Sequence, residues 1–309
     1  MRTRQIGSLE VSVIGLGCNN FGGRIDEDRS TEVVHAALDQ GITFFDTADI
    51  YGGTKSEEFL GRALGTRRDQ VVLATKFGMQ VDPQRKGAKP DYVRRALQDS
   101  LRRLGTDRID LYILHAPDPD TAIADTLAAL DDCVRAGQVG QIGCSNFSAE
   151  QLRQAEAAVA DGAARFVCVQ NEYSLLQRAP ERGVLAECRR SGVAFVPYFP
   201  LASGLLTGKY KQGEPPPPGG RLSAMPAENF AALDDKLAAA GRLAAFAQDH
   251  GHSLLELAMS WLLAHGEVAS VIAGATTAAQ VEANAAAGDW ELDEAQMKEV
   301  DALAPPAGP

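Results

Sequence analysis

The fold class is decided by residues 71–115, VVLATKFGMQVDPQRKGAKPDYVRRALQDSLRRLGTDRIDLYILH. Their pattern predicts a strand, a helix and a second strand. The two ends of the stretch, Val71–Phe77 and Ile109–His115, are mostly apolar, as strands of a parallel sheet covered on both faces should be. Between them, apolar residues recur at helical spacing from Val93 to Leu104, and Gly105 ends the pattern. The stretch therefore predicts a βαβ unit, the building block of α/β folds.

Similar apolar runs occur on both sides of this unit and alternate with amphipathic helical segments. The predicted strands are Val11–Gly17, Thr43–Asp49, Val71–Phe77, Ile109–His115, Val139–Ser145, Phe166–Asn171, Val193–Tyr198 and Ala269–Ala275. Such repeats fit either a doubly wound open sheet or a closed (β/α)8 TIM barrel, and their even spacing within one domain favours the barrel. Because TIM barrels commonly contain ~250 residues or more, we expect residues 1–309 to form a single domain.

Two segments fall outside the alternation of strands and helices. Arg4–Glu10 precedes the first strand, and we expect it to form a small hairpin across the bottom of the barrel. Phe199–Leu233 follows the seventh strand and contains the proline run Pro215–Pro218. A loop of this length in a compact domain is usually a lid or a binding loop, with a disordered insertion as the alternative.

Composition and charge limit the classes of function. The net charge of −11 disfavours binding to nucleic acid, whose phosphates require a basic surface. The N-terminal residues lack the apolar core of a signal peptide, and no apolar stretch reaches the ~18 residues of a membrane span. The 5 cysteines are scattered without a CxxC pair, which favours a reducing compartment. We therefore expect a cytoplasmic protein with a small-molecule substrate and with no nucleic-acid or membrane partner.

A metal site is not expected either. His250 and His252 are separated by one residue, but no cysteine or carboxylate lies near them at a spacing known from metal sites.

Reactive side chains gather at the C-terminal ends of three neighbouring predicted strands, where TIM barrels build their active sites. The second strand leads into Asp46 and Tyr51, the third ends near Lys76, and the fourth ends in His115. Taken singly, each has an ordinary explanation: a turn cap, a half-buried aromatic, a solvated strand end and a histidine bonded within the core.

Taken together, the same residues make a tuned proton donor. A phenol with a pKa of about 10 donates poorly near neutral pH, and a neighbouring ammonium lowers that pKa. Burial would discharge Lys76 unless a carboxylate such as Asp46 kept it charged. A neutral imidazole can hydrogen-bond a substrate oxygen and orient it. This combination suits the reduction of a carbonyl group, which needs a proton as well as a hydride.

The chain resembles the aldo-keto reductase family almost from end to end, from Gly15 to Asn284. The motifs that carry the resemblance are FFDTADIYGGTKSEEFLGRAL (44–64), ATKFG (74–78), DLYILHAPDP (110–119), IGCSNF (142–147), VQNEYSLLQR (169–178) and PLASGLLTGKY (200–210). It implies reduction of aldehydes or ketones by a nicotinamide cofactor, with Asp46, Tyr51, Lys76 and His115 as the catalytic tetrad and Tyr51 as the general acid.

The branch that it resembles includes bacterial aldo/keto reductases and potassium-channel β subunits. Two alternatives therefore stay open: a dehydrogenase that acts mainly in the oxidative direction on a sugar or alcohol, and a cofactor-binding regulatory subunit.

The resemblance also implies how the cofactor is held, in an extended pose across the mouth of the barrel and without a Rossmann fold. Consistent with this, Gly15-Leu16-Gly17 lacks the third glycine of a dinucleotide fingerprint. The implied cofactor contacts are Gly17, Cys18, Asn19, Asp46, Ser145, Asn146, Gln170, Tyr198, Phe199, Leu201, Ser203, Leu206, Lys209, Gly274, Thr276, Gln280 and Asn284. In the resemblance, Ser145, Asn146 and Gln170 hold the carboxamide, Tyr198 stacks on the nicotinamide ring, and Asn284 contacts the adenine.

The chain departs from many family members where the adenosine 2′-phosphate should bind. The family's usual lysine and arginine are replaced by Gly274 and Gln280, and no basic residue occurs in 270–290. Thr277 with Gln280 forms a plausible capping box, and amides at that helix start could hold a phosphate. We expect NADP, with NAD as the alternative, and a charge supplied by Lys209 or Arg221 of the long loop.

Overall fold

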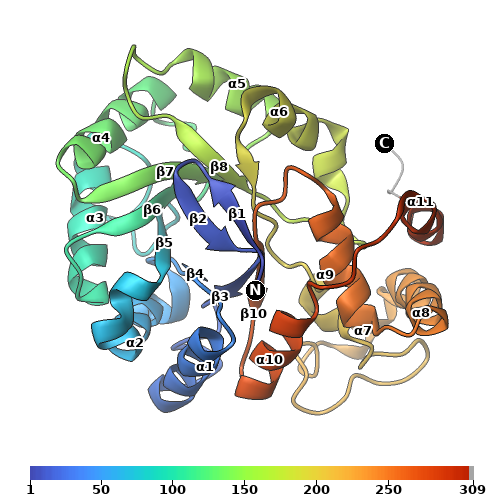
Figure 1. Ribbon diagram of the computed structural model, residues 1–309. Helices are drawn as coiled ribbons and strands as arrows, with labels where there is room; N and C mark the ends of the chain where they lie inside the picture. Colours follow the sequence, from blue (N-terminus) through green and yellow to red (C-terminus); the bar gives the residue numbers. More distant parts are fainter. Residues whose placement is uncertain (306–309) are drawn as a thin grey trace.

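The computed structural model describes residues 1–305, so residues 306–309 of the predicted domain lie outside the described residues. Parallel strands form its centre (Figure 1). They are β3 (Ile14–Gly17), β4 (Phe44–Asp46), β5 (Val72–Phe77), β6 (Ile109–Leu114), β7 (Val139–Ser145), β8 (Phe166–Gln170), β9 (Ala194–Phe195) and β10 (Val271–Gly274). Strands pair in sequence order from β3 to β9, and β10 pairs with β3.

The two ends of this sheet meet, so the sheet closes into the predicted barrel. The Phe195 amide donates to the Glu267 carbonyl at 2.8 Å, and the Ala269 amide donates to the Phe195 carbonyl at 2.9 Å. A third bond joins the Ile272 amide to the Pro197 carbonyl at 3.2 Å. These bonds give the outer edges of β9 and β10 the partners that buried backbone groups require.

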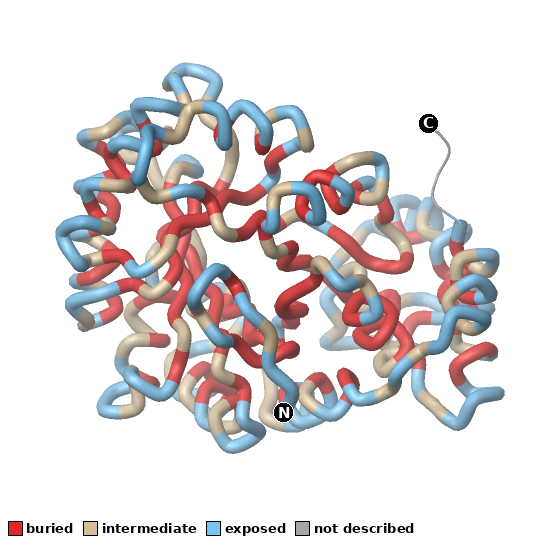
Figure 2. Tube along the Cα trace, turned by 45° about the horizontal axis from the view of Figure 1, so that its top comes forward, coloured by how far each residue is buried: buried red, intermediate tan, exposed pale blue. Residues whose placement is uncertain are grey.

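Helices surround the barrel and cover the outer faces of the strands. They are α1 (Glu27–Asp39), α2 (Lys55–Leu64), α3 (Pro90–Leu104), α4 (Ile123–Arg135), α5 (Ala149–Ala157), α6 (Val184–Ser191), α7 (Ala227–Ala231), α8 (Asp234–Asp249), α9 (Leu254–Ala264), α10 (Ala278–Ala286) and α11 (Glu294–Leu303). Figure 2 shows the buried residues concentrated on the strands and on the inner faces of the helices. The βαβ unit predicted for 71–115 is confirmed, with Gly105 in a left-handed conformation (φ 62°) at the end of α3.

The N-terminal strand boundaries differ from the prediction. The expected strand Val11–Gly17 divides, because Val11 and Ser12 pair with the preceding strand and only Ile14–Gly17 belongs to the barrel. The hairpin is therefore longer than Arg4–Glu10: it comprises β1 (Thr3–Ile6) and β2 (Leu9–Ser12). Its buried side chains Ile6 and Val11 pack against the inward-facing residues of the barrel strands, so the hairpin closes the bottom as expected.

Three further strands, β4, β9 and β10, are at least three residues shorter than predicted, and β5, β6 and β8 are one residue shorter. Past Asp46 the chain leaves regular pairing, although the Asp49 amide still donates to the Lys76 carbonyl at 3.0 Å. These irregular segments form the mouth of the barrel, where the chain turns to present side chains to the cavity.

The long loop, residues 199–233, is ordered, so the alternative of a disordered insertion is wrong. It contains a 3-10 helix, η4 (Ala202–Thr207), and the helix α7. Its own apolar cluster holds it together, with Leu205, Tyr210, Leu222 and Phe230 buried against Leu237. Among residues 1–305, no helix combines the length and the apolar character that crossing a bilayer requires.

Candidate active site

A cavity of about 570 Å³ opens at the C-terminal ends of the strands. All four residues of the predicted tetrad line it, and so do most of the expected cofactor contacts. These contacts are Gly17, Asn19, Asp46, Ser145, Asn146, Gln170, Tyr198, Phe199, Leu201, Ser203, Lys209, Gly274, Thr276, Gln280 and Asn284. Cys18 and Leu206 do not line it. Both side chains are fully buried in the core, and the Cys18 amide donates to the Asp46 carbonyl at 2.8 Å.

A buried ion pair lies at the base of the cavity. The Lys76 ammonium donates to Asp46 Oδ1 and, at 2.9 Å, to the Thr47 carbonyl. The other oxygen of Asp46 accepts from Gln170 Nε2 at 2.7 Å. Burial lowers the pKa of Lys76, but the charges and hydrogen bonds of Asp46 and Tyr51 outweigh burial and raise it above its usual value. Lys76 is therefore a fixed positive charge.

Tyr51 is placed beside this charge by a tight turn that directly follows β4. The Lys76 ammonium lies over the Tyr51 ring, 5.2 Å from its centre, so that its charge acts on the phenol. The turn requires glycine at the next position: Gly52 has φ 58°, and a Cβ there would lie 2.2 Å from the Phe21 carbonyl oxygen. Burial raises the pKa of Tyr51, while Lys76 opposes the rise. Lys76 thus acts in the expected direction, but the net pKa is raised rather than lowered.

His115 completes the group from the end of β6. Its ring meets Tyr51 edge to face, with the ring centres 5.8 Å apart. Burial, and then the charge of Lys76, lower the pKa of His115 to about 3. The imidazole is therefore neutral at physiological pH. A neutral ring can hydrogen-bond a substrate oxygen without carrying a charge into the site.

Polar side chains at or just after the ends of β7, β8 and β9 form the next part of the cavity wall. Asn146 Nδ2 donates to the His115 carbonyl at 2.9 Å, and the Tyr198 hydroxyl donates to Asn146 Oδ1 at 2.8 Å. The Ser145 hydroxyl donates to the Gln170 carbonyl at 2.9 Å. Gln170 Oε1 is buried without a hydrogen-bond partner, which is costly unless a ligand supplies a donor. A carboxamide NH₂ group is a donor of the required kind.

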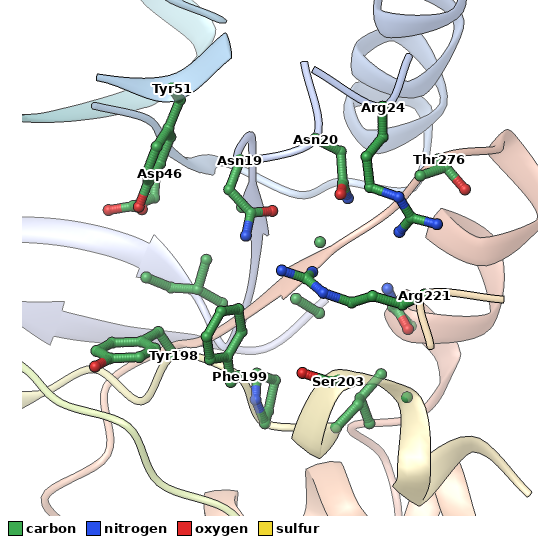
Figure 3. Close-up of a pocket in the computed structure, with 18 of the residues that line it drawn as sticks. Asn19, Asn20, Arg24, Asp46, Tyr51, Tyr198, Phe199, Ser203, Arg221 and Thr276 are labelled. Carbon is green, nitrogen blue, oxygen red and sulfur yellow. The ribbon is translucent and has the colours of Figure 1, made fainter. Parts of the chain in front are cut away.

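The far end of the cavity contains residues that the sequence reasoning missed. Asn20 and Arg24 follow β3 and line the cavity together with Thr276 and Arg221 (Figure 3). Asn20 Nδ2 donates to the Ala275 carbonyl at 3.2 Å and so joins the loop after β3 to the loop after β10. The available signal was position, since both residues belong to the first βα loop, which faces the mouth of a TIM barrel.

The segment after β10 offers fewer free donors than expected. Thr277 Oγ1 accepts from the Gln280 amide at 3.2 Å, but the Gln280 side chain turns to Thr276 and accepts from its amide at 2.8 Å. The predicted capping box is therefore only half formed, and the Thr276 amide is already used.

Asp49 lies behind the turn that carries Tyr51 and gives a prediction for stability. It is 2% exposed, and one of its oxygens has no hydrogen-bond partner. Burial, and then the charge of Glu57, raise the pKa of Asp49 to about 7, although Arg103 and the Tyr92 hydroxyl oppose the rise. A carboxyl whose folded pKa exceeds its unfolded pKa is favoured in its protonated form. The unfolding free energy therefore falls as the pH rises from about 4 towards the folded pKa.

Asp49→Asn should remove this loss. Between about pH 5 and about pH 8, the wild type should lose on the order of 2 kcal/mol of unfolding free energy relative to the variant. Urea denaturation at both pH values measures the difference, and the exposed Asp161→Asn serves as the control. If wild type and Asp49→Asn gave parallel pH profiles, Asp49 would have an ordinary pKa.

Comparison with known proteins gives consistent matches over the whole barrel. The model of the aldo/keto reductase family matches residues 13–305. The chain is 35% identical over 311 residues to the aldo-keto reductase yakc of Schizosaccharomyces pombe, whose name specifies NADP(+), covering 96% of this chain and 90% of that protein. It is also 35% identical to the aldo-keto reductase str7 of Strobilurus tenacellus, covering 98% and 91% of the two chains. The aldo-keto reductase YhdN of Bacillus subtilis is 33% identical, with 96% and 90% covered.

Proposed function

Because this chain belongs to the aldo/keto reductase family, we propose that it reduces an aldehyde or ketone with NADPH. The residues present suit such a cofactor, since Gln170 Oε1 lacks a donor at one end of the cavity and positive side chains line the other. The relative from Schizosaccharomyces pombe, named for NADP(+), supports the phosphorylated form. A single catalytic domain and a cytoplasmic location stay predictions.

One observation carries the proposal: a phenol hydroxyl, a fixed ammonium and a neutral imidazole meet at one point of the cavity wall. When bound, the nicotinamide supplies the hydride, which goes to the carbonyl carbon. His115 is placed to hydrogen-bond the carbonyl oxygen and orient it towards Tyr51. Tyr51 then donates its proton to that oxygen, and Lys76 stabilises the phenolate that remains. Solvent returns the proton to Tyr51 and completes the cycle.

The same residues could run in the oxidative direction, with a Tyr51 phenolate as the base. The relatives that the chain matches are named as reductases, so we propose reduction as the main direction.

The test is a panel of aldehydes and ketones, with NADPH or NADH oxidation followed by absorbance. We expect turnover with NADPH, and dissociation constants that favour NADPH over NADH by about tenfold, or about 1.4 kcal/mol. The preference should weaken from low to physiological salt, because exposed charges are screened. If every carbonyl left both cofactors unoxidised, the proposed reaction would be wrong. Equal dissociation constants would contradict the preference for NADPH.

A further inference from the structure

Three positive side chains line the end of the cavity that lies away from Tyr51. Arg24 comes from the loop between β3 and α1, and Lys209 and Arg221 come from the long loop. Figure 3 shows the Arg24 guanidinium beside Thr276 and the Arg221 side chain reaching across the cavity towards Phe199, whereas Asp46 and Tyr51 lie beyond Asn19. The cluster therefore occupies a part of the cavity that the proton-donating group does not use.

These charges have no acidic partner. Among the described residues, none of the three side chains makes an ion pair; Arg221 lies over the Phe199 ring at 5.0 Å, and Lys209 lies over the Tyr210 ring at 5.2 Å. Asp46 is the one carboxylate among the described residues that line the cavity, and Lys76 already neutralises it. Burial lowers the pKa of Lys209 and of Arg221, and the charge of Arg24 lowers both further. The cluster is thus mutually repulsive, and a bound anion would relieve the repulsion.

The position of the cluster identifies the anion. A dinucleotide that lay along the cavity with its nicotinamide beside Tyr51 would bring its adenosine end to the part lined by Thr276, Gln280 and Asn284. Gly274 and Gln280 supply no charge there, and the Thr276 amide is bound to Gln280. Arg24, from the loop after β3, places its guanidinium beside Thr276, and Arg221 of the long loop lines the adjoining part of the cavity, where the charge of Arg24 acts on it. Guanidinium groups bind phosphate with paired, charge-assisted hydrogen bonds.

We infer that Arg24, together with Arg221, forms a clamp for the 2′-phosphate of the cofactor, and that Arg24 is a main determinant of the preference for NADPH. This inference rests on the proposed function for the identity of the cofactor. In this chain, one arginine from the loop between β3 and α1 and one from the long loop take the place of basic residues after β10.

The test measures dissociation constants by calorimetry for NADPH, NADH, 2′,5′-ADP and 5′-AMP. In Arg24→Gln, the constants for NADPH and 2′,5′-ADP should rise by about tenfold, the effect of one charge-assisted hydrogen bond at a partly exposed position. The constants for NADH and 5′-AMP should stay nearly unchanged. Arg221→Gln should show the same selectivity. Arg29→Gln is the matched control, because Arg29 is an exposed arginine of α1 that pairs with Glu32 outside the cavity.

The outcomes separate this inference from the proposed function. 2′,5′-ADP contains no nicotinamide, so its dependence on Arg24 would support the clamp even if every carbonyl in the panel failed to react. Conversely, carbonyl reduction with an unchanged NADPH affinity in Arg24→Gln would overturn the clamp and leave the reaction standing. Equal losses for NADPH and NADH would place Arg24 at the pyrophosphate and also overturn the inference.

Discussion

Tyr51→Phe is expected to lower the turnover of carbonyl reduction by ~10²–10⁴-fold, the usual contribution of a general acid. The substitution removes the hydroxyl on which the Lys76 charge acts but keeps the ring that packs against His115. The cavity should therefore keep its shape, and the dissociation constant of the cofactor should hardly change. Steady-state kinetics and a fluorescence titration measure the two quantities.

Tyr112→Phe is the matched control for this experiment. Tyr112 is a fully buried tyrosine of β6 whose hydroxyl has no partner, and it does not line the cavity. Tyr112→Phe also removes a phenol oxygen, but from a position outside the cavity that has no proposed part in the reaction. Its turnover should therefore stay near the wild-type value. Wild-type turnover in Tyr51→Phe, or equal losses in both variants, would remove Tyr51 from the role of proton donor.

Lys76→Met should reduce both activity and stability, because Lys76 pairs with Asp46 and also stabilises the phenolate of Tyr51. Without the ammonium, Asp46 is left as a carboxylate that is 4% exposed and retains the hydrogen bond from Gln170. Breaking a buried ion pair in this way typically costs ~3–5 kcal/mol of unfolding free energy. Turnover should fall as well, since the phenolate loses the charge that stabilises it. Urea denaturation and kinetics give the two readouts.

The double variant with Asp46→Asn tests the coupling between the two residues. Once Lys76 is methionine, neutralising Asp46 should restore part of the lost stability, so the two losses should not add. If the losses of unfolding free energy in the two single variants summed to the loss in the double variant, the ion pair would be contradicted. Arg94→Met is the surface control: its pair with Asp132 is about half exposed, and its loss should cost at most ~1 kcal/mol.

The convergence of three of the four proposed catalytic residues could be predicted from sequence because it depends on strand order. In a parallel barrel with strands adjacent in sequence order, the ends of β4, β5 and β6 must be neighbours, so Asp46, Lys76 and His115 must converge. Apolar runs and strand ends are visible in a sequence, and the barrel follows from their number.

The other features of the site lie on irregular backbone. Such backbone has no repeating pattern of apolar residues from which the direction of a side chain could be predicted. Arg24 belongs to a loop of glycines and asparagines, and nothing in its spacing shows that it faces Arg221. Cys18 lies between two cavity-lining residues, Gly17 and Asn19, yet its side chain is buried in the core. The division of the first predicted strand at Val13 was hidden for a similar reason, since apolar residues continue through it.

The hairpin that closes the bottom of the barrel has a consequence for synthesis on the ribosome. Arg4 donates to the carbonyls of Leu263, His265 and Val268, partners that are 259, 261 and 264 residues away in the chain. At about 5–20 residues per second, these partners are made tens of seconds after Arg4. The hairpin therefore leaves the ribosome well before these partners and is among the last segments to find its place. Until then Ile6 and Val11 lack the part of their buried cluster that Ala269 and Ile272 supply, and a chaperone could bind them.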